Sequence, residues 1–216
     1  MLVLFDVDNT LLNTDLMVAR LRQQMANTVG DAHAERFWEL YEEIRDAGDS
    51  VNVPETLERF SLECADLPAV NRMSEIIYGF EFAGCVFEGA LEAVNHGWQL
   101  GGAAILSDGD QLWQRHKIVA SGLDAAVRGR VMVQKHKERE IERMRSRFPA
   151  PHYVMLDDKL RLLAGAKRQL GKVLTTVHVC QGKYASRPEA VAPADLEIAS
   201  ISDFLRFDAA ALHKSA

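Results

Sequence analysis

Apolar residues between Thr14 and Gly84 recur at helical spacing. Phe37, Leu40, Tyr41 and Ile44 are one example and follow the i, i+3, i+4, i+7 pattern of a buried helix face. Short breaks rich in glycine, proline, serine and aspartate divide the region into four segments. The pattern predicts four helices with short connections, as in a small antiparallel bundle.

The rest of the chain alternates short apolar runs with helical patterns. The runs predict strands at residues 1–5, 103–106, 131–133, 153–156, 175–179 and 196–198. Helices are expected between them, including one with its apolar face at Leu112, His116, Val119 and Leu123, and others at 137–148, 159–170 and 203–207. A surface loop is expected at 186–194. This alternation predicts an α/β fold with a doubly wound, Rossmann-like parallel sheet.

These two patterns predict two domains. The α/β core would comprise residues 1–13 and 85–216, and the helical insert would comprise residues 14–84. A chain of 216 residues is long enough for a core of this kind with a smaller insert.

Composition and charge narrow the class of protein. A net charge of −6 argues against a general nucleic-acid binder. Three widely spaced cysteines match neither a disulfide framework nor a zinc pattern. The N-terminus lacks the basic region of a signal peptide, and no stretch is apolar enough to span a bilayer. We therefore expect a cytoplasmic protein that does not associate with membranes or nucleic acid.

The segment Asp6-Val7-Asp8-Asn9-Thr10 directly follows the first predicted strand. Two interpretations are open: a strand-ending turn that caps a helix, or a pair of carboxylates that bind a cation or act as nucleophile and general acid. A calcium-binding EF-hand loop is excluded, because Leu11 occupies its glycine position and Met17 its glutamate position.

Other predicted strands also end in polar groups. Ser107-Asp108-Gly109 follows the second strand, Lys135 and Lys137 follow the third, and Asp157-Asp158 follows the fourth. Taken singly, these are also turns, helix caps and solvated lysines. Because the carboxyl ends of parallel strands share one edge of a sheet, all of them can converge on one site.

In this order, the four motifs resemble those of the haloacid dehalogenase (HAD) superfamily of phosphotransferases. The resemblance implies Mg²⁺ as cofactor, Asp6 as the nucleophile that forms an aspartyl-phosphate, and Asp8 as general acid and base. Asp6, the backbone carbonyl of Asp8 and Asp158 would hold the metal, and Asp157 would orient its neighbours. The helical insert is similar to the family's first-position cap.

The resemblance also implies a phosphate-binding site. Ser107 would donate its hydroxyl to a phosphate oxygen, and a lysine would neutralise the charge shared by the phosphate and Asp6. Spacing does not separate Lys137 from Lys135, although Lys137 lies at the entry to a helix. Residues expected to contact the substrate as well are Thr10, Asp108 and Gly109.

Three features refine the expected chemistry. Asp8 favours phosphate over halide displacement, because halide leaves without a proton. The absence of lysine from residues 14–84 argues against a phosphonate-cleaving member, which would use a cap lysine. Leu162 occupies a place where many members carry an acid or asparagine, which predicts a thinner shell around the metal.

We therefore expect a Mg²⁺-dependent phosphatase of a small phosphorylated metabolite. Alternatives are a catalytically weak phosphate-binding or regulatory protein, and a phosphotransferase or mutase. Tyr41 and Arg45, one helical turn apart, are candidates for substrate contact in the cap. The basic segment 115–147 either attracts anionic ligands or forms solvated helix faces. The sequence identifies neither the substrate nor the oligomeric state.

Overall fold

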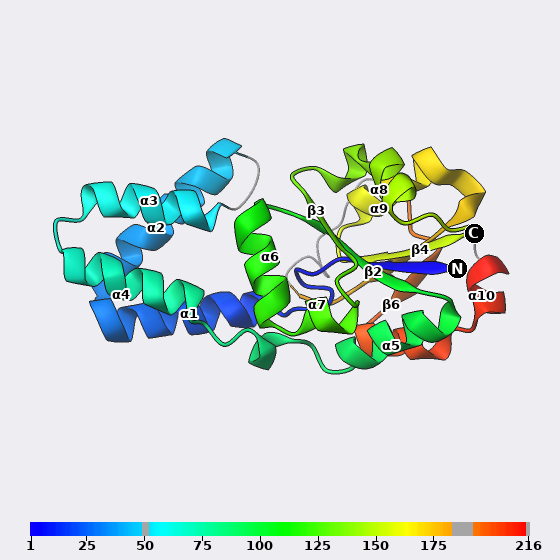
Figure 1. The fold of residues 1–216 in the computed structure, drawn as a ribbon, viewed down its shortest axis with the longest axis horizontal. Helices are drawn as coiled ribbons and strands as arrows, with labels where there is room; N and C mark the ends of the chain where they lie inside the picture. The colour runs from blue at the N-terminus through cyan, green and yellow to red at the C-terminus, as the bar shows by residue number, and fades with distance from the viewer. Residues whose placement is uncertain (49–51, 183–191, 215–216) are drawn as a thin grey trace.

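The computed structural model describes residues 1–48, 52–182 and 192–214, and it contains a six-stranded parallel sheet (Figure 1). The strand order is β3-β2-β1-β4-β5-β6, which confirms the predicted α/β fold class. The strands are β1 Leu2–Phe5, β2 Ala103–Asp108, β3 Val131–Gln134, β4 Tyr153–Asp157, β5 Leu174–Val179 and β6 Leu196–Ile198. Most of the loop expected at 186–194 lies outside the described residues.

Side chains of the central strand β1 alternate between two hydrophobic layers. Val3 and Phe5 belong to one layer and Leu2 and Leu4 to the other, as the two-residue period of a strand requires. Helix α5 covers the first face, and α8 and α9 cover the second (Figure 1). The helices and 3₁₀ turns of the core are η1 Ala83–Cys85, α5 Ala90–Leu100, α6 Gln111–Ala120, α7 Leu123–Ala126, η2 Lys137–Arg139, α8 Ile141–Arg147, α9 Leu160–Leu170, η3 Gly171–Val173, η4 Ile201–Arg206 and α10 Ala209–Lys214.

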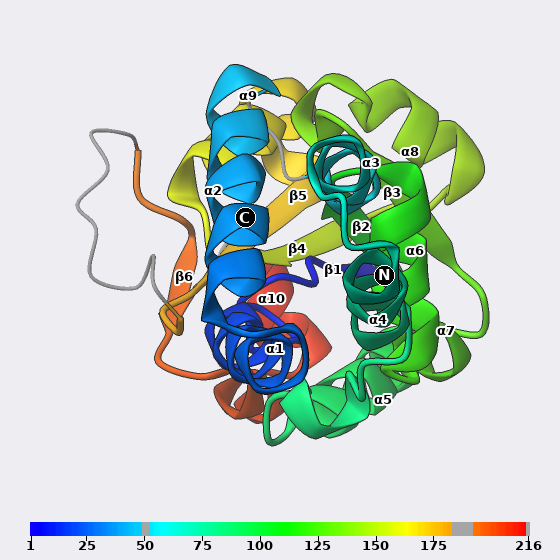
Figure 2. The same ribbon diagram turned by 90° about the vertical axis from the view of Figure 1, so that its left-hand side faces the viewer.

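Four helices inserted after β1 form a cap at one end of the core (Figures 1 and 2). Polar side chains start three of them: Asn13, Asn52 and Asp66 each accept a hydrogen bond from a backbone N–H of the first turn. The cap helices are α1 Thr14–Val29, α2 Asp31–Gly48, α3 Val53–Glu63 and α4 Leu67–Tyr78.

The two chain segments that join cap and core are hydrogen-bonded to each other. The N–H of Asn13 donates to the carbonyl of Cys85 at 2.8 Å, and the N–H of Phe87 donates to the carbonyl of Leu11 at 2.9 Å. These bonds hold the base of the cap next to the loop that follows β1, and this loop contains Asp6 and Asp8.

The predicted buried face of helix α6 is wrong at Leu112 and Val119. Leu112 and Val119 are 72% and 63% exposed, whereas Gln114 and Lys117 are buried. The helix turns this other face inward because Trp113 packs against aromatic rings of the cap connection, and because the two polar side chains bond to an acid of the core.

Two other helix predictions need correction. The helix expected at 137–148 is a 3₁₀ turn, η2, followed by the shorter α8. The helix expected at 203–207 is the 3₁₀ segment η4, which starts at a capping box formed by Ser200 and Asp203. Helices α5 and α10 were not predicted. Among the described residues, none of the helices combines the length and apolarity that crossing a membrane requires.

Asp195 ties β5 to α9 and should contribute to stability in a pH-dependent way. Burial opposes its ionisation, but hydrogen bonds from Lys167 and Thr176 hold its pKa below the usual value. A lowered folded-state pKa stabilises the protein above the unfolded-state value of about 3.9, and this contribution is lost as pH falls through the folded value.

We therefore expect Asp195→Asn to lower the free energy of unfolding by about 1–2 kcal/mol at pH 7. The difference from wild type should shrink as pH falls below about 5. Denaturant unfolding across this pH range measures both effects, with Asp46→Asn, an exposed cap residue, as control. A difference that is absent at pH 7, or constant with pH, would contradict the assignment.

Candidate active site

Lys137 and Asp6 form a fully buried ion pair at the carboxyl edge of the sheet. The N–H of Asp6 still bonds to the carbonyl of Leu156 on β4, so its carboxylate emerges where β1 ends. Lys137 Nζ lies 2.5 Å from Asp6 Oδ1 and 2.6 Å from Asp157 Oδ2. Burial alone would lower the pKa of Lys137, but these carboxylates raise it well above the usual value. The two carboxylates therefore favour the charged form of the ammonium.

The structure places Lys137, and not Lys135, at this site. Lys135 is exposed, whereas the backbone N–H of Lys137 donates to Asp108 Oδ1 at 2.8 Å. Gly109 has φ of +136° and donates its N–H to the carbonyl of Gln134, which brings the ends of β2 and β3 together. Asp108 and Gly109 thus position the lysine.

Asp6, Asp157 and Asp158 form an acidic cluster whose oxygens lie within 4.8 Å of one another. Asp157 Oδ1 accepts the N–H of Lys159 at 3.0 Å, which turns its other oxygen toward Lys137. Burial, together with the charges of Asp157 and Asp6, raises the pKa of Asp158. Burial likewise raises the pKa of Asp6, although Lys137 opposes this.

This cluster fits a divalent cation with a preference for oxygen ligands. Both carboxylate oxygens of Asp158 and Oδ2 of Asp6 are buried and have no hydrogen-bond partner among the described residues. Buried carboxylates normally have such partners or bind a metal. A Mg²⁺ ion would satisfy these oxygens and offset the burial and mutual repulsion that raise the pKa values of Asp6 and Asp158.

Asp8 is held by three side chains from both parts of the molecule. Lys117 Nζ lies 2.5 Å from its Oδ1, Gln114 Nε2 donates to its Oδ2 at 2.6 Å, and Thr14 Oγ1 of the cap donates to Oδ1 at 2.7 Å. Burial alone would raise the pKa of Asp8, but Lys117 and these hydrogen bonds hold it far below its usual value. In this arrangement Asp8 is an ionised carboxylate.

Ser107 and Thr10 bring hydroxyl groups to the same edge. Ser107 Oγ accepts a hydrogen bond from Gln114 at 2.8 Å, which leaves its own hydrogen for another acceptor. Thr10 Oγ1 is buried without a hydrogen-bond partner among the described residues. The carbonyl of Thr10 accepts a bond from Gln181 at 2.7 Å, which anchors the loop.

Sequence reasoning missed Gln114, Lys117 and Thr14. Gln114 and Lys117 lie one turn apart on the helix that begins three residues after Asp108, so their spacing was a usable signal. The apolar pattern through Leu112 and Val119 predicted the opposite face of the helix as buried, so this signal was not used.

The basic segment 115–147 divides between the site and the surface. Two of its lysines, Lys117 and Lys137, enter the site. The ion pairs Glu140–Arg143 and Glu142–Arg145, in α8 and the residue before it, are exposed.

The two cap candidates differ in their surroundings. Tyr41 packs edge-on against Trp38 with ring centroids 5.0 Å apart. Burial raises the pKa of Tyr41, and the negative charge of Asp8 adds to this effect. Arg45 instead pairs with Glu42 on its own helix at 2.5 Å.

Leu162 is a buried residue of α9 and supplies no polar group to the acidic cluster. The backbone of Asp158 is instead held by a residue of β5: His178 Nε2 lies 3.3 Å from the carbonyl oxygen of Asp158. The carbonyl can only accept, so Nε2 carries the hydrogen.

Removal of the buried ammonium should be strongly destabilising. In metal-free buffer, Lys137→Ala removes the ammonium shown in direct contact with both buried carboxylates, Asp6 and Asp157, and we expect a loss of about 3–5 kcal/mol in the free energy of unfolding. Lys135→Ala, at an exposed position in the same loop, should change it by less than about 0.5 kcal/mol. Denaturant titration of both variants checks this, and equal stability of the two would refute the assigned role of Lys137.

Comparison with known proteins agrees with this geometry. No protein-family model and no curated protein matches the chain. A protein of Burkholderia xenovorans LB400 that is assigned to the haloacid dehalogenase-like hydrolases shares 40% identity over 96% of this chain and 98% of its own, with a TM-score of 0.87.

Two more distant structures share the fold alone. L-2-haloacid dehalogenase from Xanthobacter autotrophicus has a TM-score of 0.64 at 16% identity over 95% of this chain and 98% of its own. The HAD-hydrolase YfnB from Bacillus subtilis, solved with bound magnesium, has a TM-score of 0.61 at 16% identity over 94% and 96%. The extent and identity of the Burkholderia match, together with the fold, show that this chain belongs to the haloacid dehalogenase-like hydrolase superfamily.

Proposed function

We propose that the chain is a Mg²⁺-dependent phosphohydrolase of small phosphorylated metabolites. The main support for this proposal is the environment of the two carboxylate oxygens of Asp6. One of its oxygens is neutralised by Lys137, and the other is buried without a hydrogen-bond partner among the described residues, beside Asp157 and Asp158. Such an oxygen is a desolvated, oriented nucleophile.

In the proposed reaction, Asp6 Oδ2 attacks phosphorus and forms an aspartyl-phosphate, while the bond from phosphorus to the leaving oxygen breaks and its electron pair leaves with that oxygen. Water then hydrolyses the aspartyl-phosphate, which releases phosphate and restores the Asp6 carboxylate. Ser107 donates its hydroxyl to a phosphate oxygen, and Lys137 balances the charge shared by the phosphate and Asp6. Asp6, Asp158 and the backbone carbonyl of Asp8 would hold Mg²⁺, which offsets the repulsion between nucleophile and phosphate. Asp157 aligns Lys137 for this role.

Asp8 starts without a proton, because Lys117, Gln114 and Thr14 hold its pKa far below the usual value. The same contacts make Asp8 a weak base, so they must loosen before it accepts a proton. It would take the proton of the water that attacks the aspartyl-phosphate in the second step. Leaving-group protonation in the first step would require Asp8 to gain a proton before substrate turns over. The arrangement therefore favours substrates whose leaving group is a stable anion, such as a phenolate.

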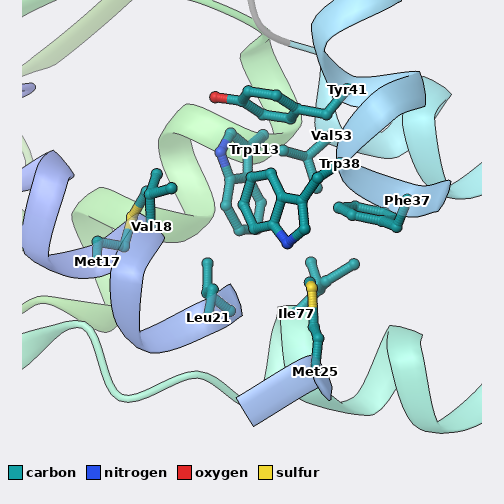
Figure 3. A pocket seen from close by; sticks show the side chains of 10 residues that line it. All are labelled: Met17, Val18, Leu21, Met25, Phe37, Trp38, Tyr41, Val53, Ile77 and Trp113. Carbon is teal, nitrogen blue, oxygen red and sulfur yellow. The ribbon is translucent and has the colours of Figure 1, made fainter. Parts of the chain in front are cut away.

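A small apolar pocket among the cap helices, with Trp113 of the core on one side, favours a substrate with an apolar group. Figure 3 shows its lining, in which the ring of Trp113 from α6 faces cap side chains. The residues are Met17, Val18, Leu21, Met25, Phe37, Trp38, Tyr41, Val53, Ile77 and Trp113. Trp113, the lining residue that comes from the core, is adjacent in sequence to Gln114, which bonds to Asp8. We propose that the substrate carries a small apolar group that packs against this lining.

A catalytically weak phosphate-binding protein is the second candidate. The ion pair between Lys117 and Asp8 favours it, because this pair withholds the proton that most leaving groups need. In either case the activity belongs to a reducing compartment such as the cytoplasm, which agrees with three cysteines that are free thiols.

Turnover of an aryl phosphate separates these candidates. We expect wild-type protein to hydrolyse p-nitrophenyl phosphate only with Mg²⁺, and Asp6→Asn to lower kcat by about 10³-fold or more. Asp46→Asn, which removes an exposed carboxylate of the cap, should leave kcat unchanged. Phosphate binding by calorimetry without any turnover would instead favour the binding protein, and equal turnover by Asp6→Asn would exclude Asp6 as nucleophile.

The pocket predicts a preference among aryl phosphates, whose leaving groups are stable anions. For wild type, kcat/KM should rise from phenyl to 4-ethylphenyl phosphate, because each buried CH₂ contributes about 0.8 kcal/mol. Val18→Asn places an amide in the pocket and should reduce the 4-ethylphenyl-to-phenyl ratio of kcat/KM by about tenfold. Val119→Asn, on the exposed face of α6, is the matched control and should leave the ratio unchanged. An unchanged ratio in both variants would remove the pocket from substrate binding.

A further inference from the structure

A second cluster of metal-binding side chains lies at the β5–β6 edge of the sheet. His178 belongs to β5, Cys180 is the first residue after β5, and Glu197 belongs to β6. One ligand atom from each lies within 4.8 Å of the other two. This cluster contains none of the carboxylates of the acidic cluster.

Strand geometry brings these side chains to one face. Residues two apart on a strand point to the same side, which aligns His178 with Cys180. The N–H of Cys180 bonds to the carbonyl of Ile198 at 2.8 Å, so strand pairing extends to it. Glu197 is the direct partner of His178 in the β5–β6 register. The three donors are therefore set by backbone pairing.

The separations match a tetrahedral zinc site. Cys180 Sγ lies 3.3 Å from His178 Nδ1, and this nitrogen lies 3.4 Å from Glu197 Oε2. Zinc bond lengths of about 2.3 Å to sulfur and 2.0–2.1 Å to nitrogen or oxygen place neighbouring ligand atoms about 3.4–3.6 Å apart. The side chains need to move little to surround an ion.

The imidazole of His178 has the hydrogen placement that a metal ligand needs. Its Nε2 hydrogen points to the carbonyl of Asp158 at 3.3 Å. In the neutral ring, Nδ1 then carries a lone pair, which faces the thiol of Cys180 and the carboxylate of Glu197. Histidine ligands commonly donate their second N–H to a backbone carbonyl in this way, which orients the ring.

We propose that His178 Nδ1, Cys180 Sγ and the carboxylate of Glu197 bind a Zn²⁺ ion. The mixture of sulfur, nitrogen and oxygen donors suits zinc and does not suit Mg²⁺ or Ca²⁺, which prefer oxygen. Three protein ligands leave the fourth position of the tetrahedron to water or another donor. Chain spacing alone does not reveal the site, because Glu197 joins it only through strand pairing.

Cobalt spectroscopy of the full chain, reduced and freed of metal, tests the proposal. We expect one equivalent of Co²⁺ to produce a thiolate-to-cobalt charge-transfer band and the strong visible bands of tetrahedral cobalt. Zn²⁺ should abolish these bands and excess Mg²⁺ should not. Cys180→Ser should eliminate the charge-transfer band, whereas Cys64→Ser, which removes a thiol at the end of α3, should retain it.

Glu197→Gln provides a variant that is expected to fold normally, because this side chain is 72% exposed. It should weaken Co²⁺ binding at least about tenfold. Cobalt binding without a thiolate band would place the ion among the oxygens of the acidic cluster and overturn the proposal. So would a band that Cys180→Ser retains, unchanged affinity in Glu197→Gln, or no cobalt binding, which would leave the three side chains as a hydrogen-bonded group.

Discussion

The contact on which the site depends is the buried ammonium of Lys137 between Asp6 and Asp157. These carboxylates come from adjacent central strands, β1 and β4, whose register is fixed by backbone pairing. Burial of three charged groups is costly, and the pairing offsets that cost only while all three stay in place. Asp108 secures the lysine from the other side by accepting its backbone N–H. The ends of β1, β2 and β4 and the segment after β3 are distant in sequence, and all four meet at Lys137.

A second buried lysine organises the other half of the site. Lys117 of α6 pairs with Asp8, and Thr14 from the first turn of the cap donates to the same carboxylate. Asp8 is thus contacted by both parts of the molecule. A movement of the cap that displaced α1 would change the hydrogen bonds of Asp8, and so would connect the position of the cap with the proton transfer that we propose for Asp8.

The sequence predicted what depends on local pattern. The parallel sheet followed from apolar runs alternating with helices, and the edge location of Asp6, Ser107 and Asp158 followed from their places at strand ends. It did not separate Lys135 from Lys137, because that choice depends on a contact with Asp108 across the sheet edge. It also chose the wrong face of α6, because the inward-facing side chains there include a lysine and a glutamine that are stable inside only opposite Asp8.

A strand neighbour can hold Asp158 in place where α9 lacks a polar side chain for this role. Leu162 provides no polar group, yet the backbone of Asp158 accepts a hydrogen bond from His178 on the adjacent strand β5. The other nitrogen of that imidazole faces Cys180 and Glu197. Any group that binds this nitrogen will fix the ring, and the ring in turn fixes the carbonyl beside the acidic cluster. One imidazole therefore connects the edge of the sheet to the candidate catalytic metal site, and this coupling depends on the β4–β5 pairing.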